Sequence, residues 1–262
     1  MTQDTARGLA LGTGARAAAR STSALLYNVA GLSVGRVYHL ETDVAYFARE
    51  RTLAAAAGVA DSLTSALAAG LSARWLRSLG TGGYSGLDFR LGFALPLSDA
   101  LSVGALGRYL SLNRQGSGPK GDKTKLRVTK GIALGAAIRA RLLEQCELAL
   151  LAGNVLSTAG DRTPRRLGAS VAVDFAGAAT VGADLLHVTA AGGYVIAGAG
   201  AEYRHELLAL RAGYRYQGLA ERHALSAGLG YSKPRAALDL SLRRTLNGSD
   251  TTLMLALRYF VQ

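Results

Sequence analysis

The chain has 262 residues, 49% of them hydrophobic, which is enough to bury a core or to coat a membrane barrel. Thirty Lys and Arg against 18 Asp and Glu give a net charge of +12, which favours a polyanionic neighbour such as nucleic acid, anionic lipid or lipopolysaccharide phosphate. The single cysteine, Cys146, excludes a disulfide framework and a thiolate metal cluster. The 33 glycines beside 4 prolines favour β-structure over disorder or collagen-like repeats.

The N-terminal segment differs from the rest of the chain, because residues 7–34 lack strand alternation and are rich in Ala and Gly. The run from Gly14 to Arg20 predicts a short helix, since alanine favours helix. Apolar residues at 24–27 and Leu32 are suited to packing. We therefore predict that residues 1–36 form a hatch inside the remaining chain, 37–262; the alternative is a frayed, disordered tail.

Strand patterning begins at Tyr38. Segments of about ten residues alternate apolar with small or polar side chains, the period of a strand with unlike faces. The pattern is clearest at 87–97, where five large apolar residues alternate with smaller ones. We predict an all-β, transmembrane antiparallel barrel of about fourteen strands, or twelve if weak segments such as 52–60 are miscounted. The predicted strands are 38–46, 52–60, 65–77, 87–97, 101–113, 128–140, 147–156, 167–175, 179–188, 194–203, 207–216, 223–232, 236–246 and 251–261.

The predicted connections alternate between short and long. Short ones lie at 61–64, 98–100, 141–145, 176–178, 205–206 and 233–235, and longer ones at 78–86, 114–127, 157–166 and 218–222. Outer-membrane barrels have this asymmetry, with tight periplasmic turns and longer outer loops.

The less apolar face of the strands is mostly Gly, Ala and Ser with inserted charges, which leaves volume for the hatch inside the barrel. Candidate lumenal charges are His39, Glu41, Asp43, Arg90, Arg108, Arg139, Arg211, Arg215, Arg243 and Arg258. Because the first and last strands are neighbours in a closed barrel, we expect the three on the first strand to meet Arg243 and Arg258 near the seam. Buried charge requires a partner or water, so a structural role in holding the plug or wall is favoured over lining a pore.

A basic segment occupies the longest predicted outer loop, 114–127. Its cations are Arg114, Lys120, Lys123, Lys125 and Arg127. We interpret them as facing outer-membrane lipid and lipopolysaccharide phosphates; the alternatives are a merely solvated loop and a nucleic-acid patch. The aromatic side chains on which bases stack are absent, so nucleic acid is disfavoured.

Catalytic patterns are missing from the sequence. The four histidines are scattered without the close spacing of zinc ligands, and Gly80 to Gly83 lacks the Lys and Ser/Thr of a phosphate-binding loop. We therefore predict no enzymatic activity, no metal site and no cofactor.

The N-terminal segment carries a family resemblance in the run Gly12-Thr-Gly-Ala-Arg-Ala and, after Ser23, the run Ala-Leu-Leu-Tyr-Asn-Val-Ala-Gly-Leu. This resembles the hatch of the long-chain fatty-acid transporter (FadL) superfamily and its shorter PorV-like relatives, although Val29 stands where the family usually has Pro. The resemblance implies a fourteen-stranded barrel with the N-terminal segment inside. The matching hatch residues are Gly12, Gly14, Ala15, Arg16, Asn28, Ala30, Gly31 and Leu32.

Both ends of the chain indicate where in the cell the protein is located. The last strand, 251–261, alternates apolar residues and closes in aromatics, which resembles the signal for insertion into the outer membrane. The start, MTQDTARG, lacks the apolar core of a signal peptide, so we expect a mature bacterial outer-membrane chain from which that peptide has been removed.

The leading functional hypothesis is a structural or accessory component of an envelope assembly of the secretion or motility type, with other envelope-machine proteins as partners, or a restricted channel. The alternative is FadL-like uptake of hydrophobic small molecules, which a break in one strand beside a plugged apolar pocket would favour. A second alternative is a soluble, basic, β-rich protein that binds anionic polymers.

Overall fold

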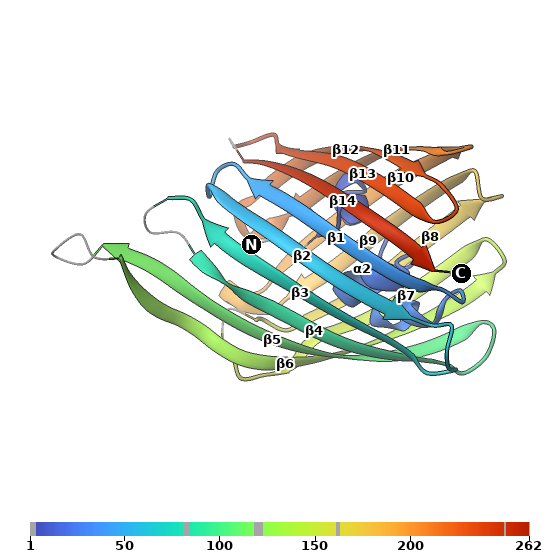
Figure 1. Cartoon of the computed structure of the whole chain (residues 1–262), viewed down its shortest axis with the longest axis horizontal. Coiled ribbons are helices and arrows are strands. Elements are labelled where there is room, and N and C mark those ends of the chain that lie inside the picture. Colours follow the sequence, from blue (N-terminus) through green and yellow to red (C-terminus); the bar gives the residue numbers. More distant parts are fainter. Residues whose placement is uncertain (1–3, 81–83, 118–122, 161–162, 249, 262) are drawn as a thin grey trace.

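The computed structural model describes residues 4–80, 84–117, 123–160, 163–248 and 250–261. Within these ranges, fourteen antiparallel strands form a closed barrel in which each strand pairs with its sequence neighbours and β1 pairs with β14 (Figure 1). The strands are β1 (Tyr38–Phe47), β2 (Thr52–Asp61), β3 (Ala68–Ser78), β4 (Tyr84–Pro96), β5 (Leu101–Ser117), β6 (Lys123–Leu143), β7 (Cys146–Ser157), β8 (Arg166–Phe175), β9 (Ala179–Val188), β10 (Tyr194–His205), β11 (Leu208–Gln217), β12 (Arg222–Ser232), β13 (Ala236–Thr245) and β14 (Thr251–Val261). The predicted barrel and the count of fourteen are confirmed.

The two faces of the wall have opposite character. On β1 the outward side chains of Leu40 and Val44 are 42% and 47% exposed, whereas the inward carboxylates of Glu41 and Asp43 are 8% and 7% exposed. The same arrangement continues around the barrel, so the protein presents apolar side chains outward and charges inward. Such an exterior is stable in lipid and not in water. The alternative of a soluble β-rich protein is therefore wrong, and the chain is an outer-membrane barrel.

The helices are all short, and no helix in the described ranges is long and apolar enough to cross a membrane. Two 3₁₀ turns, η3 (Ala190–Gly192) and η4 (Gly218–Ala220), lie in connections between strands.

The hairpin formed by β5 and β6 is longer than predicted and projects beyond the barrel rim (Figure 1, left). The two strands stay paired as far as Ser117 and Lys123, past a register shift between Leu112 and Asn113. The prediction of a long loop over 114–127 is therefore wrong, as is that of a loop over 78–86, because β4 begins at Tyr84. Polar residues can continue a strand beyond the membrane when their backbone groups remain paired.

Because β5 and β6 are longer than predicted, the candidate basic residues in the described ranges lie on strands and not in a loop. Arg114 lies on β5, and Lys123, Lys125 and Arg127 lie on β6, while Lys120 falls outside the described residues. The cations belong to strands of the projecting hairpin and not to a coil.

The N-terminal segment lies inside the barrel as α1 (Ala6–Ala10), α2 (Ser21–Tyr27) and η1 (Val29–Ser33). The predicted helix from Gly14 to Arg20 is wrong, because these residues form turns. The backbone N–H of Arg16 donates to Asp184 Oδ1 at 3.2 Å, and that of Ala17 donates to Ser170 Oγ at 2.8 Å. These contacts with the wall outweigh the helix preference of the alanines.

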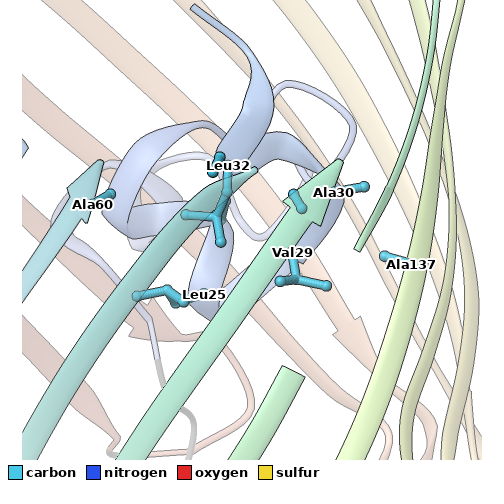
Figure 2. Close-up of a cluster of buried hydrophobic side chains, with 9 residues drawn as sticks. Leu25, Val29, Ala30, Leu32, Ala60 and Ala137 are labelled. Atoms are coloured by element: carbon cyan, nitrogen blue, oxygen red, sulfur yellow. The ribbon is translucent and has the colours of Figure 1, made fainter. Parts of the chain in front are cut away.

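An apolar cluster joins the hatch to one side of the wall. Leu25, Val29, Ala30 and Leu32 pack against small wall residues that include Ala60 and Ala137 (Figure 2). Leu25 and Leu32 are fully buried, and each such burial contributes roughly 1.5–3 kcal/mol. The small-residue inner face of the strands therefore makes room for the larger side chains of the hatch.

Candidate functional site

Ion pairs fasten the hatch to the wall along its length. Arg7 pairs with Glu202 at 3.0 Å, and Arg20 pairs with Glu147 at 2.9 Å. Arg16 lies 3.4 Å from the Asp184 carboxylate, and its guanidinium is 5.1 Å from the centre of the Tyr27 ring. Three hatch cations thus meet acids on three different strands, β7, β9 and β10.

Asp4 is the buried anion of the hatch. Its carboxylate accepts from Arg243 at 2.7 Å and from the Tyr27 hydroxyl at 3.1 Å, and it lies 4.0 Å from Arg215. Burial by itself would raise the pKa of Asp4, but Arg243 and Arg215 outweigh it and lower that pKa to about 2. Burial, with the neighbouring Asp4 charge, raises the pKa of Tyr27 above its usual value. Asp4 is therefore ionised throughout the physiological range.

The residues predicted to meet at the barrel seam have other partners. Asp43 pairs with Arg74 at 3.1 Å, and Arg258 pairs with Asp239 at 2.5 Å. Arg243 pairs with Asp4 of the hatch. The seam itself is confirmed, since β1 pairs with β14, and Glu41 stands directly opposite Arg258 in that register, whereas Asp43 and Arg243 have nearer partners in Arg74 and Asp4.

Two predicted seam residues also contact α2. Glu41 accepts a hydrogen bond from Thr22, and His39 Nδ1 contacts Ser21. His39 also stacks on Phe260 with ring centroids 4.7 Å apart.

Arg90, Arg108, Arg139 and Arg211 are paired within the wall, while Arg215 lies near Asp4 of the hatch. Asp88 lies 3.3 Å from Arg90 and 3.0 Å from Arg108. Arg139 contacts Glu147 at 2.5 Å. Arg211 bridges Glu202 at 2.5 Å and Asp239 at 2.6 Å. These pairs lie inside the barrel, and those of Asp88 with Arg108, Arg139 with Glu147 and Arg211 with Glu202 fasten adjacent strands to one another.

The hatch-motif residues act through close packing. A Cβ added at Gly14 would lie 2.5 Å from Ala199 Cα, and one added at Gly31 would lie 1.9 Å from the Ala19 carbonyl oxygen. Gly12 has φ +60°, a conformation that favours glycine. Ala15 is buried in the same turn.

Further along, the Ala30 carbonyl accepts from Ser102 Oγ at 3.1 Å, and Leu32 lies in the apolar cluster. Asn28 is 1% exposed, and its side-chain amide has no hydrogen-bond partner among the described residues. Val29, at the position where proline was expected, packs in the same cluster as Leu32.

The hatch separates two open cavities. One of about 880 Å³, the inner vestibule, lies at the end with short turns and is lined by residues such as Gln145, Gly177 and Ser232. The other, of about 460 Å³, is the outer vestibule at the hairpin end and is lined by residues such as Tyr84 and Gln217. Sequence analysis predicted neither, because each is bounded by residues from many strands.

The β6–β7 pocket, of about 100 Å³, lies between the hatch and the wall. Its apolar lining includes Leu25 and Val29 of the hatch, Leu106 of β5 and Leu151 of β7, and its polar lining comes from Asn28, Asn154, Arg16, Arg90, Arg108 and Arg166. Ala136 of β6 also lines it, and its alternate neighbours Leu134 and Ile138 face outward. The pocket therefore extends from the hatch into the wall.

The strand ladder is broken at this pocket. Leu134 pairs with Leu156, but Ala136 pairs with Ala152, so Gly135 alone stands opposite 153–155. A Cβ at Gly135 would lie 3.0 Å from the Ala152 carbonyl oxygen, and Asn154 has φ +54°. Three β7 residues against one glycine make a bulge with more extra residues than the usual two-against-one kind, and β-bulges are over-represented at barrel rims and next to active sites.

No protein-family model and no curated protein matches the sequence. Solved structures match along nearly the whole chain. The Ralstonia pickettii toluene transporter TbuX is 14% identical over 100% of this chain and 99% of that chain, with a TM-score of 0.74. The Pseudomonas putida toluene transporter TodX is 14% identical over 99% of this chain and 98% of that one, with a TM-score of 0.67. A Pseudomonas aeruginosa FadL homologue is 11% identical over 98% of each chain, also with a TM-score of 0.67.

These similarities establish the fold. It is the fourteen-stranded FadL-like barrel of the bacterial outer membrane, with a short N-terminal helical segment. The resemblance inferred from the hatch motif is thereby confirmed at the level of fold.

Proposed function

We propose that this chain, a barrel with the FadL-like outer-membrane fold, takes up small hydrophobic molecules. The observation that carries the proposal is the broken β6–β7 ladder beside a pocket with apolar side chains from both hatch and wall, in a barrel whose straight path is occupied by the hatch. A molecule that enters the outer vestibule would reach the pocket at the level of the hatch. The break at Gly135 then offers a route toward the wall.

The names of the similar structures support uptake over an accessory role. Two are toluene transporters, and another is a monoaromatic hydrocarbon channel, CymD. The hypothesis of a structural or accessory component rested on shorter relatives of the family, and no feature of the described residues adds to it. Uptake is therefore the function that we put forward.

The test places a large side chain at the pocket. Leu106→Trp adds an indole where the inward face of β5 borders the pocket, and uptake of radiolabelled toluene by whole cells should fall to the rate of cells that lack the protein. The matched control is Ala227→Trp, an outward-facing alanine on β12, which should transport like the unaltered chain. Heat-modifiable mobility on unheated electrophoresis checks that both variants fold.

Two results would contradict the proposal. One is wild-type toluene uptake no faster than in cells without the protein. The other is unchanged uptake by folded Leu106→Trp, which would exclude the β6–β7 pocket from the route while leaving the barrel intact.

A further inference from the structure

An excess of arginine lies at the floor of the outer vestibule. Five arginines line this cavity near the hatch: Arg16, Arg108, Arg166, Arg215 and Arg243. The carboxylates in the same lining are Asp4 next to the hatch, and Glu50 and Asp250, which lie in the connections at the rim. The floor therefore carries more positive than negative charge.

Two of the five arginines lack a close anion. Arg16, Arg108 and Arg243 pair with acids, as described above. Arg215 is 8% exposed and reaches only Asp4, at 4.0 Å, while Arg243 holds the same carboxylate oxygen at 2.7 Å. Arg166 has no ion-pair partner within the described part of the chain, and its buried Nε has no hydrogen-bond acceptor. Buried cations without partners are costly, so an incoming anion would be favoured here.

The arginines also lie where two different environments meet. Arg16, Arg108 and Arg166 line both the outer vestibule and the β6–β7 pocket, as does Leu186. A molecule at this junction would place an anionic group against guanidinium donors and an apolar group against Leu25, Leu106 and Leu151. The junction thus suits an amphipathic anion better than a wholly apolar molecule.

The size of the pocket restricts the apolar part. Its volume is about 100 Å³, and a dry apolar cavity of roughly 150 Å³ accommodates benzene. One ring therefore fits with modest movement of the side chains around it, whereas a long alkyl chain does not. Guanidinium groups bind planar carboxylates through paired hydrogen bonds.

From these observations we propose that the vestibule–pocket junction is a binding site for small aromatic carboxylates, held by Arg166 at the junction and assisted by the charge of Arg215 in the adjoining vestibule floor. This inference rests on the proposed uptake function and narrows its substrate class. A carboxylate at this site would complete the hydrogen bonding of Arg166, while its ring would occupy the β6–β7 pocket.

The test compares benzoate with benzamide, which has nearly the same shape and no charge. Calorimetric titration of the full chain in detergent should show tighter binding of benzoate, by roughly tenfold or more, because a hydrogen bond to a charged group contributes about 1.5–3 kcal/mol. Arg166→Gln and Arg215→Gln should each weaken benzoate binding by roughly tenfold and leave benzamide unchanged. Arg141→Gln, which removes an exposed cation from the end of the barrel with short turns, is the matched control and should change neither.

The outcomes separate the two proposals. Benzamide binding as tightly as benzoate, or a benzoate preference that persists in both folded variants, would overturn the carboxylate site while leaving uptake of hydrophobic molecules in place. If neither compound binds and toluene uptake is also absent, both proposals fail. If neither compound binds but toluene is still taken up, only the carboxylate site is overturned.

Discussion

The hatch contacts the barrel in different ways on two of its sides. Against β9–β11 it lies backbone to backbone: a Cβ at Gly200 would fall 2.4 Å from Leu11 O, and one at Gly213 would fall 2.3 Å from Gly12 N. Against β6 and β7 it presents side chains, and a pocket remains where the ladder is broken. The hatch therefore packs tightly against β9–β11 and leaves a pocket between itself and β6 and β7.

This difference explains where a binding site can form. Glycines on β9–β11 let two backbones approach closely, which leaves no volume for a ligand. On β6 and β7 the hatch meets the wall through side chains, and a pocket of about 100 Å³ remains beside the bulge opposite Gly135. Incomplete packing between the hatch and the wall therefore marks the place where a small molecule can be accommodated.

The largest effect should come from adding a methyl group on the tightly packed side. Gly213→Ala would force the Gly12 backbone away from β11, and we expect a loss of about 3 kcal/mol in the free energy of unfolding, the upper part of the range for overpacking. The temperature at which the unheated electrophoretic form disappears measures it. Stability equal to that of the unaltered chain would show that the hatch is not held there.

The next effect concerns the charge that holds the N-terminus. The pKa of Asp4 is about 2, below its ordinary value of 3.8, so its ionised form adds stability that is present above about pH 4 and is lost as the pH falls through 2. Asp4→Asn should therefore lower the free energy of unfolding by about 2 kcal/mol at pH 7. Hydrogen exchange of residues 5–10 measures the change, and the difference between the two chains should shrink at pH 2. A difference independent of pH would mean that the charge does not hold the hatch.

A smaller loss is expected at the hydroxyl group that contacts Asp4. Tyr27→Phe keeps the ring beneath Arg16 but removes the hydrogen bonds to Asp4 and from the Thr5 backbone N–H. We expect this change to lower the free energy of unfolding by about 1 kcal/mol, measured by the same hydrogen-exchange experiment. The loss should be much reduced in a chain that already carries Asp4→Asn, since the two residues share one network.

The smallest effect should be on the open side. A Cβ at Gly153 would meet Arg166 Cβ at 3.6 Å, an ordinary contact, so Gly153→Ala should change the free energy of unfolding by less than about 0.5 kcal/mol. Measuring Gly153→Ala and Gly213→Ala together compares directly the loosely packed β6–β7 side with the tightly packed β9–β11 side. Equal destabilisation by both would remove the distinction between them.

Much of the architecture follows from local pattern. Residues of alternating character, such as Leu87 to Leu95, specify a strand with one apolar face, and a closed barrel is the arrangement that places all such faces in lipid. The small residues of the inner face likewise predicted a filled lumen, because Gly and Ala leave volume. Strand ends were less predictable, since backbone pairing extends the β5–β6 hairpin through polar residues.

The sequence by itself therefore determined the barrel, its seam and the presence of a hatch. The two-residue alternation and the small side chains that predict them are properties of residues that are neighbours in the sequence. Only the tertiary structure decided the partners of the lumenal charges, the turns of 14–20 and the pocket. Asp4 matches no motif, yet it lies beside Arg243 because the hatch crosses the lumen. The break at Gly135 likewise appears only when β6 is placed beside β7, since register is a property of two strands together.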